Sequence, residues 1–246
     1  MKGICRGCNQ KKNLIKAHII PESFFREINT SGQMSILIEG KKDSYIKRCP
    51  IGIYDQNILC PECENIFQMA DDYAQDLLLK SSNKRRILFD GKGDIYFFEN
   101  YNYKLLKRFV ISLLWRASIS KDIFYSHINI GTFEARAKEL LWNDSIGTPD
   151  EFDFFFYFLG DLKEKSILQP VQCRVNDKNV NRFYLGKNLL FIKVDNRKFD
   201  PHPIYARDGE PLYFGSSQES QERVLKEALN IVSKANTSNF HLKTKS

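Results

Sequence analysis

Two short stretches, Cys5-Arg6-Gly7-Cys8 and Cys60-Pro61-Glu62-Cys63, decide the fold of this chain. Each is a Cys-x-x-Cys knuckle that offers two thiolates on one tight turn. Two such knuckles together supply four sulfur ligands, which is the tetrahedral set that structural zinc prefers. The sequence therefore predicts one structural zinc ion, bound by Cys5, Cys8, Cys60 and Cys63.

Disulfide bonds and redox chemistry are the alternatives for these cysteines. The chain runs from Met1 straight into the first knuckle without a secretory signal, so we expect a cytoplasmic protein with reduced thiols. A thioredoxin-like site needs one pair between a strand and a helix, whereas here two pairs stand far apart. The long gap between the two cysteine pairs still allows one shared zinc site, because the free-energy cost of loop closure rises by only about 0.6 kcal/mol per doubling of loop length. Cys49, inside the gap, is an alternative ligand, and Cys173 is expected to be a small core residue.

A histidine phrase lies between the two knuckles. Ala17-His18-Ile19-Ile20-Pro21 is predicted to be a short strand that the proline ends. Residues 52–59 are predicted to be a turn and a second short strand that leads into Cys60, and residues 64–79 have helical spacing. The predicted order is strand, strand, helix, with zinc knuckles at both ends.

This combination resembles the zinc-finger branch of the HNH endonucleases. The likeness covers about residues 3–80 and implies a ββα-metal, treble-clef zinc module. Further along, a Leu-Leu-Trp-Arg-Ala-Ser phrase at residues 113–118 is similar to one in uncharacterised bacterial and phage HNH-type proteins, but it brings no chemistry. The motifs that carry the likeness are both knuckles, Ala17-His18-Ile19-Ile20-Pro21-Glu22-Ser23-Phe24, Asn57-Ile58-Leu59-Cys60 and Glu64-Asn65.

The resemblance implies catalytic roles for three residues in hydrolysis of DNA phosphodiester bonds. His18 would be the general base that takes a proton from the attacking water, and an imidazole with a pKa of about 6.5 suits that work. Asn57 would brace the two strands and help to orient the histidine. Glu64, taken as the first residue of the helix, would bind one catalytic divalent metal such as magnesium or manganese.

Two positions depart from the pattern of the family. Ala17 stands where a metal ligand normally precedes the base, and an alanine cannot coordinate. Glu64 stands where the family commonly has His or Asn, although its carboxylate suits a hard cation, together with Gln68 or with Asp71 and Asp72. The full ligand set of the catalytic metal is therefore open.

Each candidate catalytic residue also has a purely structural interpretation. His18 would donate to the backbone of a non-catalytic zinc finger, Asn57 would bond the backbone across a turn, and Glu64 would favour a helix N-terminus. The alternative to a nuclease is then a catalytically degenerate zinc-finger protein that binds nucleic acid or a partner protein.

The charge balance agrees with DNA as the partner. Lys and Arg number 37 against 30 acidic residues, a net charge of +7, which is the sign that displaces counterions from a phosphate backbone. Some of the Lys and Arg residues occur in clusters of two or three. Such short clusters are usually solvated faces, so each cluster alone is weak evidence for DNA binding. No apolar run approaches the roughly 18 residues of a membrane span, so no membrane partner is expected. The basic clusters in or beside residues 1–80 are Lys11-Lys12, Lys41-Lys42, Lys47-Arg48 and Lys84-Arg85-Arg86.

Residues 81–235 are predicted to form a second, mixed helix and antiparallel-sheet domain of unknown role, so that the whole chain is α+β. Gripping DNA, binding a partner protein and sensing a ligand are the open roles for this domain, and the basic tail at 236–246 is expected to be disordered. Trp115 and Trp142 are expected in the core, while His127 and His202 stand alone. The predicted helices are 103–118, 133–142 and 216–235, and the predicted strands are 152–159, 167–175, 181–185 and 189–194, with a hairpin turn at 186–188.

Overall fold

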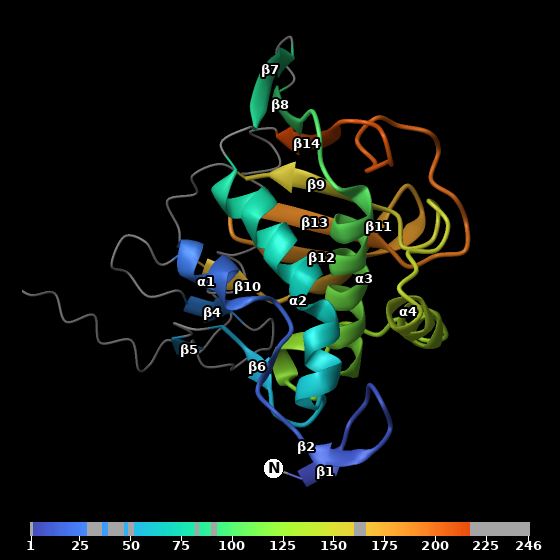
Figure 1. Ribbon diagram of the computed structural model, residues 1–246. Coiled ribbons are helices and arrows are strands. Elements are labelled where there is room, and N and C mark those ends of the chain that lie inside the picture. The colour runs from blue at the N-terminus through green and yellow to red at the C-terminus, as the bar shows by residue number, and fades with distance from the viewer. Residues whose placement is uncertain are drawn as a thin grey trace, which may run out of the picture.

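The computed structural model of the protein has the mixed α+β architecture that the sequence predicts (Figure 1). Helices α2 and α3 lie side by side in front of a large sheet, and α4 flanks α3 on the far side from α2. No described helix is long and apolar enough to cross a membrane. The structure describes residues 2–28, 36–38, 47–48, 52–81, 84–89, 93–159 and 166–216.

Two small antiparallel sheets organise the N-terminal residues. β1 (Lys2–Ile4) pairs with β2 (Lys11–Asn13), and the first knuckle forms the turn between them. β3 (Ala17–His18) pairs with β6 (Tyr54–Asp55), which brings two segments far apart in the sequence together. α1 (Glu22–Ile28) follows β3. A three-stranded sheet has the order β10 (Ser166–Leu168), β4 (Ile36–Ile38) and β5 (Lys47–Arg48).

The helix after the second knuckle begins earlier than predicted. α2 spans Pro61–Gln75 and continues as one π-helical turn, η1 (Asp76–Lys80). The start at Pro61 has a physical reason, because a proline at the first helical position has no N–H to leave unsatisfied and its φ is already helical. Glu64 therefore lies in the first turn of α2 and is not its first residue. The predicted order of strand, strand and helix is confirmed.

The two helices predicted in the middle of the chain are present. α3 spans Tyr103–Ile119, and the Asn102 side chain caps it by accepting a hydrogen bond from the Leu105 amide. α4 spans Phe133–Trp142, after a short 3-10 turn, η2 (Ile123–Tyr125). Almost every side chain of α3 is buried, because α2, α4 and the sheet surround it.

The large sheet has seven strands in the order β11-β12-β13-β9-β14-β8-β7, and every pairing is antiparallel except that of β9 with β14. The strand predicted at 167–175 is two strands in different sheets, because Pro170 lacks the N–H that a ladder needs. Ser216 ends β14, so it does not begin a helix, and the rest of the predicted helix 216–235 and the tail lie outside the described residues. The strands are β7 (Arg85–Phe89), β8 (Gly93–Phe98), β9 (Phe154–Phe158), β11 (Val171–Val175), β12 (Lys178–Leu185), β13 (Asn188–Lys193) and β14 (Leu212–Ser216).

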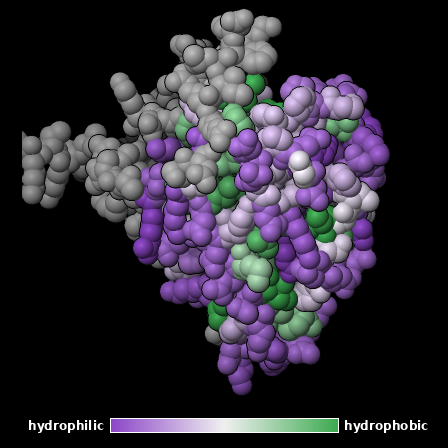
Figure 2. Space-filling view, turned by 45° about the horizontal axis from the view of Figure 1, so that its top comes forward, coloured by the Kyte–Doolittle hydropathy of each residue, from purple (hydrophilic) through white to green (hydrophobic). Residues whose placement is uncertain are grey.

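One hydrophobic core runs through both halves of the chain. It joins Cys5 and Phe67 of the N-terminal residues to Trp115 of α3 and Phe156 of the sheet, and Trp142 packs against it. Trp115 is thus a core residue, as predicted, whereas Trp142 is partly buried at the edge of the core, and His127 is exposed. The face drawn in Figure 2 is largely hydrophilic, with hydrophobic residues in small groups. The boundary predicted near residue 80 stays a prediction, although the packing is continuous across it.

Candidate metal centre and active site

The four knuckle cysteines meet at the N-terminal end of α2. Their Sγ atoms all lie within 4.8 Å of one another, and only Cys8 is partly exposed. Zinc with Zn–S bonds of about 2.3 Å in a tetrahedron needs sulfur atoms about 3.8 Å apart, so the cluster fits that ion after a small contraction. These four residues could hold a metal ion, as the sequence predicts. Cys173 lies in β11, partly exposed, and Cys49 is outside the described residues.

Backbone amides donate hydrogen bonds within the cysteine cluster and favour the thiolate form of Cys5. The Cys60 amide donates to Cys5 Sγ at 3.3 Å, and the Arg6 amide donates to the Ile58 carbonyl at 2.8 Å. Burial opposes ionisation of Cys5, but the backbone N–H groups of Cys8, Cys60 and Gly7 lower its pKa to about 7. Burial raises the pKa of Cys60 to about 11 and that of Cys63 further. Four sulfur atoms this close cannot all carry charge alone, so a divalent cation would stabilise the set.

The first knuckle is packed against α4. A Cβ on Gly7 would lie 2.7 Å from Cys63 Sγ and 2.7 Å from the Trp142 ring, so only glycine fits there. Lys138 donates to the Arg6 carbonyl at 2.7 Å, and the Trp142 and Trp115 ring centroids are 5.1 Å apart. The four-cysteine site is therefore in direct contact with the shared core.

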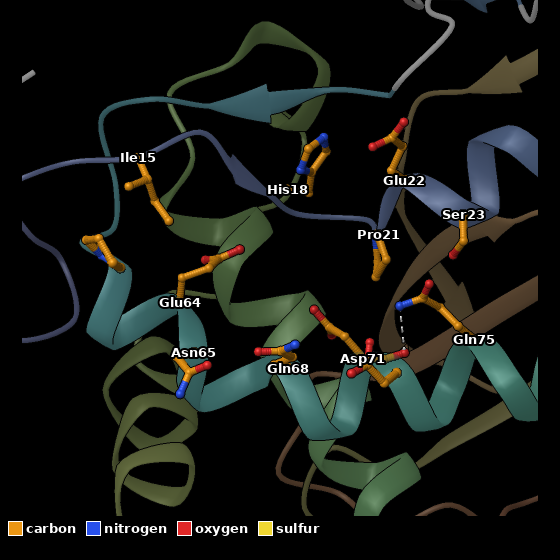
Figure 3. Close-up of a pocket in the computed structure, with 12 residues that line it drawn as sticks. Ile15, His18, Pro21, Glu22, Ser23, Glu64, Asn65, Gln68, Asp71 and Gln75 are labelled. Atoms are coloured by element: carbon orange, nitrogen blue, oxygen red, sulfur yellow. Dashed lines mark hydrogen bonds between the residues drawn. The ribbon is translucent and has the colours of Figure 1, made fainter.

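A pocket of ≈ 410 Å³ lies between α2 and the segment that carries β3 and the start of α1. In Figure 3, Glu64, Gln68 and Asp71 extend from α2 towards the segment that carries His18 and Pro21. The structure thus brings His18 and Glu64 together in one pocket, with the other carboxylates named from the sequence. The residues that line it are Ile15, His18, Pro21, Glu22, Ser23, Pro61, Glu64, Asn65, Gln68, Asp71, Asp72 and Gln75.

His18 is half-buried on the strand wall of this pocket. Its backbone pairs with Tyr54 of β6, and the two rings meet edge to face with centroids 5.8 Å apart. Neighbouring residues of a strand point to opposite sides. Ala17 accordingly points away from the pocket, and its side chain is fully buried. A longer side chain at residue 17 would therefore enter the core and not the pocket.

Asn57 is placed outside the pocket. It is exposed in the turn after β6, and its backbone N–H donates to Asp55 Oδ1 at 2.8 Å. Asp55 itself is buried, and its Oδ2 accepts from Ser120 Oγ at 3.0 Å and from the Lys121 amide at 2.8 Å. Asp55 therefore ties β6 to the end of α3. Sequence reasoning missed this residue, although a carboxylate next to buried strand positions needs partners and was a usable signal.

A buried ion cluster lies beneath the α2 wall. Arg116 of α3 donates to both carboxylate oxygens of Asp71, at 2.7 Å and 2.9 Å. Its Nη1 is 4.0 Å from Glu64 Oε1, and Glu64 Oε2 is buried with no hydrogen-bond partner among the described residues. Burial raises the pKa of Glu64, and the Arg116 charge offsets this only in part. Sequence reasoning passed over Arg116 because its partners are distant in the chain.

The described residues of the pocket do not form a second tight ligand cluster. Across the described parts of the chain, the cysteines are the one group of three or more His, Cys, Asp or Glu whose ligand atoms lie that close together. Glu64, Asp71 and His18 line the same pocket without converging in this way. A catalytic metal at Glu64 would need these side chains to move towards it.

Comparisons of the chain with protein-family models, with curated proteins and with solved structures give no match. The likeness to HNH endonucleases therefore rests on the motifs quoted above, and the function has to be argued from the site itself.

Proposed function

We propose that this protein is a metal-dependent HNH-type endonuclease that hydrolyses DNA phosphodiester bonds, with His18 as the general base. The observation that carries the proposal is the shared pocket, in which His18 on β3 and Glu64 on α2 form opposite walls. The four-cysteine centre at the start of α2 holds that helix in place beside β3. This arrangement supports a strand-borne base acting across from a helix-borne metal ligand.

His18 suits a base because its position is fixed while its ring borders the pocket. The strand pairing with Tyr54 and the hydrogen bond from Arg116 to the His18 carbonyl hold its backbone. A neutral imidazole at that place would take the proton of a water directed at the scissile phosphate. Removal of such a base typically costs about 100- to 10,000-fold in rate.

The charge of the pocket supports metal dependence. Among the described residues that line it are four carboxylates, those of Glu22, Glu64, Asp71 and Asp72, and no Lys or Arg. A phosphate would be repelled there in the absence of a cation. The unpartnered Oε2 of Glu64 is a suitable ligand atom for magnesium or manganese, with Gln68 or Asp72 nearby on the same wall. A divalent cation at Glu64 would offset the repulsion and stabilise the leaving oxygen.

A catalytically degenerate zinc-finger protein is the second candidate. The absence of a second tight ligand cluster from the described residues favours it. Such a protein would bind DNA or a partner protein through other surfaces and would not need the pocket.

Plasmid nicking by the full-length protein separates the two candidates. The protein is treated first with a weak chelator that spares tightly held zinc, and magnesium, manganese and nickel are then added in turn. If the protein is a nuclease, nicking appears when a divalent metal is added, while the zinc content stays at one per chain. No nicking with any of the three metals, at constant zinc, would favour the degenerate finger.

A further inference from the structure

Arg116 lies outside residues 3–80, yet its side chain reaches the pocket from beneath. A guanidinium has five N–H donors, and each of those of Arg116 has an acceptor. Nε donates to the Ser112 carbonyl at 3.3 Å. Nη1 donates to the His18 carbonyl and to Asp71 Oδ2, both at 2.9 Å. Nη2 donates to Asp71 Oδ1 at 2.7 Å and to Ser112 Oγ at 3.2 Å.

These bonds join both walls of the pocket to one rigid group. The His18 carbonyl belongs to the strand wall, Asp71 belongs to the α2 wall, and Ser112 belongs to α3. The Arg116 side chain is only 1% exposed, and its guanidinium carbon lies 5.0 Å from the centre of the Phe67 ring. A planar, fully hydrogen-bonded guanidinium in this position has little freedom, so it fixes the spacing of the two walls.

The same bonds distinguish the two carboxylates beside Arg116. Asp71 receives two charge-assisted hydrogen bonds, which commit both of its oxygens. Glu64 is 4.0 Å from the nearest Arg116 nitrogen and receives none of the five donors. Arg116 thus faces two acidic groups that both line the pocket, and Glu64 is the one whose Oε2 has no hydrogen-bond partner among the described residues.

We propose that Arg116 is a positioning residue of the His18 site, which ties the His18 carbonyl to Asp71 and leaves Glu64 as the pocket carboxylate that receives a divalent cation. The inference rests on the proposed nuclease function and extends it, because it makes α3 part of the site. The zinc module alone would then lack a group that its active site needs.

The test compares three variants with a matched pair of controls. Arg116→Gln leaves Asp71 as an uncompensated buried charge, whereas Arg116→Gln with Asp71→Asn removes both charges, and Arg116→Lys keeps the charge without the planar fork. Arg108 is the control, because it is also a buried arginine of α3. It donates to the Leu141 carbonyl at 2.9 Å and pairs with Asp144 at 3.0 Å, away from the pocket. Its variants are Arg108→Gln, alone and with Asp144→Asn.

Melting temperature, nicking rate and manganese affinity are measured for each protein, the last by the electron paramagnetic resonance signal of free Mn²⁺. We expect Arg116→Gln to lower the melting temperature and the double variant to recover most of that loss. Nicking by the double variant should stay reduced by about 100-fold, since misplacement by about 1 Å can cost that much. Its manganese affinity should fall about tenfold or more, while both Arg108 variants keep wild-type nicking and affinity.

A double variant that nicks and binds manganese like wild type would overturn the proposal, because Arg116 would then only neutralise Asp71. If the wild-type protein does not nick DNA, the proposed function fails, and manganese affinity alone decides the role of Arg116. The positioning role then stands if wild type binds Mn²⁺, Glu64→Gln abolishes that binding and the double variant weakens it. Absence of Mn²⁺ binding by wild type at the pocket would overturn it.

Discussion

The backbone amide of Cys60 donates a hydrogen bond to the Sγ atom of Cys5, at 3.3 Å. This bond joins the two knuckles directly, although a long stretch of chain separates them. It closes the four-cysteine site at the N-terminal end of α2, the helix that carries Glu64 and Asp71. The four-cysteine site and the pocket are therefore connected through α2, which contributes residues to both.

Zinc removal should destabilise the whole described core. Cys60→Ser is expected to lose its zinc and to lower the melting temperature by about 10 °C or more, because structural zinc contributes directly to folding and the knuckles share the core. Metal content by mass spectrometry and thermal unfolding measure both effects. Cys173→Ser is the control and should keep one zinc per chain. A Cys60→Ser protein with full zinc and an unchanged melting temperature would refute the four-cysteine assignment.

Trp142 should report the state of the metal centre. Its ring packs over Gly7, and the same close approach involves Cys63 Sγ. Removal of zinc with a strong chelator should loosen the knuckle and shift the tryptophan emission to longer wavelength as the ring meets water. Trp142→Phe should abolish most of the shift, whereas Trp115, deeper in the core, should contribute little. An emission spectrum that does not change on complete zinc removal would contradict this packing.

Asp55 and Asn57 should differ in importance, although they are two residues apart. Asp55→Ala removes the acceptor of three hydrogen bonds at a buried site and should lower the free energy of unfolding by about 1–3 kcal/mol. The nicking rate should also fall, because β6, which pairs with the strand of His18, would be displaced. Asn57→Ala changes an exposed side chain and should alter stability by less than about 0.5 kcal/mol. Denaturant unfolding and nicking rates test the pair. A large loss of activity in Asn57→Ala at unchanged stability would instead support the catalytic brace predicted from the sequence.

Glu64 should make stability depend on pH in a defined direction. Because its pKa is raised in the folded state, its carboxylate is neutral and harmless below the pKa of the unfolded chain, about 4.3. As pH rises through the folded pKa, the buried group ionises and stability falls. Glu64→Gln should therefore melt a few degrees above wild type at pH 7 to 8 without divalent metal, and this difference should vanish near pH 4.

The control for this effect is Glu210→Gln, since Glu210 is exposed. Addition of manganese should reduce the difference between wild type and Glu64→Gln at pH 7 to 8, because a bound cation stabilises the ionised carboxylate. A Glu64→Gln variant that melts below wild type throughout the pH range would show that the Arg116 charge outweighs the burial of Glu64.

Local patterns in the sequence predicted the parts of the structure that depend on nearby residues. The helix at 133–142 matches its prediction, and the knuckle spacing identified all four cysteines, because helical periodicity and ligand spacing are short-range properties. The helix start at Pro61 and the strand break at Pro170 were missed, although a proline signals each. In both cases the proline was present in the sequence, but its effect on the element boundary was not recognised.

The rest of the site depends on contacts between distant segments, which one sequence does not reveal. The Arg116 side chain meets His18 and Asp71 only after α3 packs against α2. Ala17 could be judged only once the strand pairing showed that its side chain faces the core. Residue types and spacings thus predicted the candidate base and the metal centre, whereas the partners that position them required the fold.

The rate of plasmid nicking by His18→Ala tests the central claim most directly, with His127→Ala as the control at an exposed histidine. Zinc content, melting temperature and DNA affinity are measured on the same preparations, so that loss of folding is recognised. The account predicts that His18→Ala nicks about 100- to 10,000-fold more slowly than wild type with zinc and DNA affinity unchanged, while His127→Ala keeps the full rate. Nicking by His18→Ala at the wild-type rate would contradict the account.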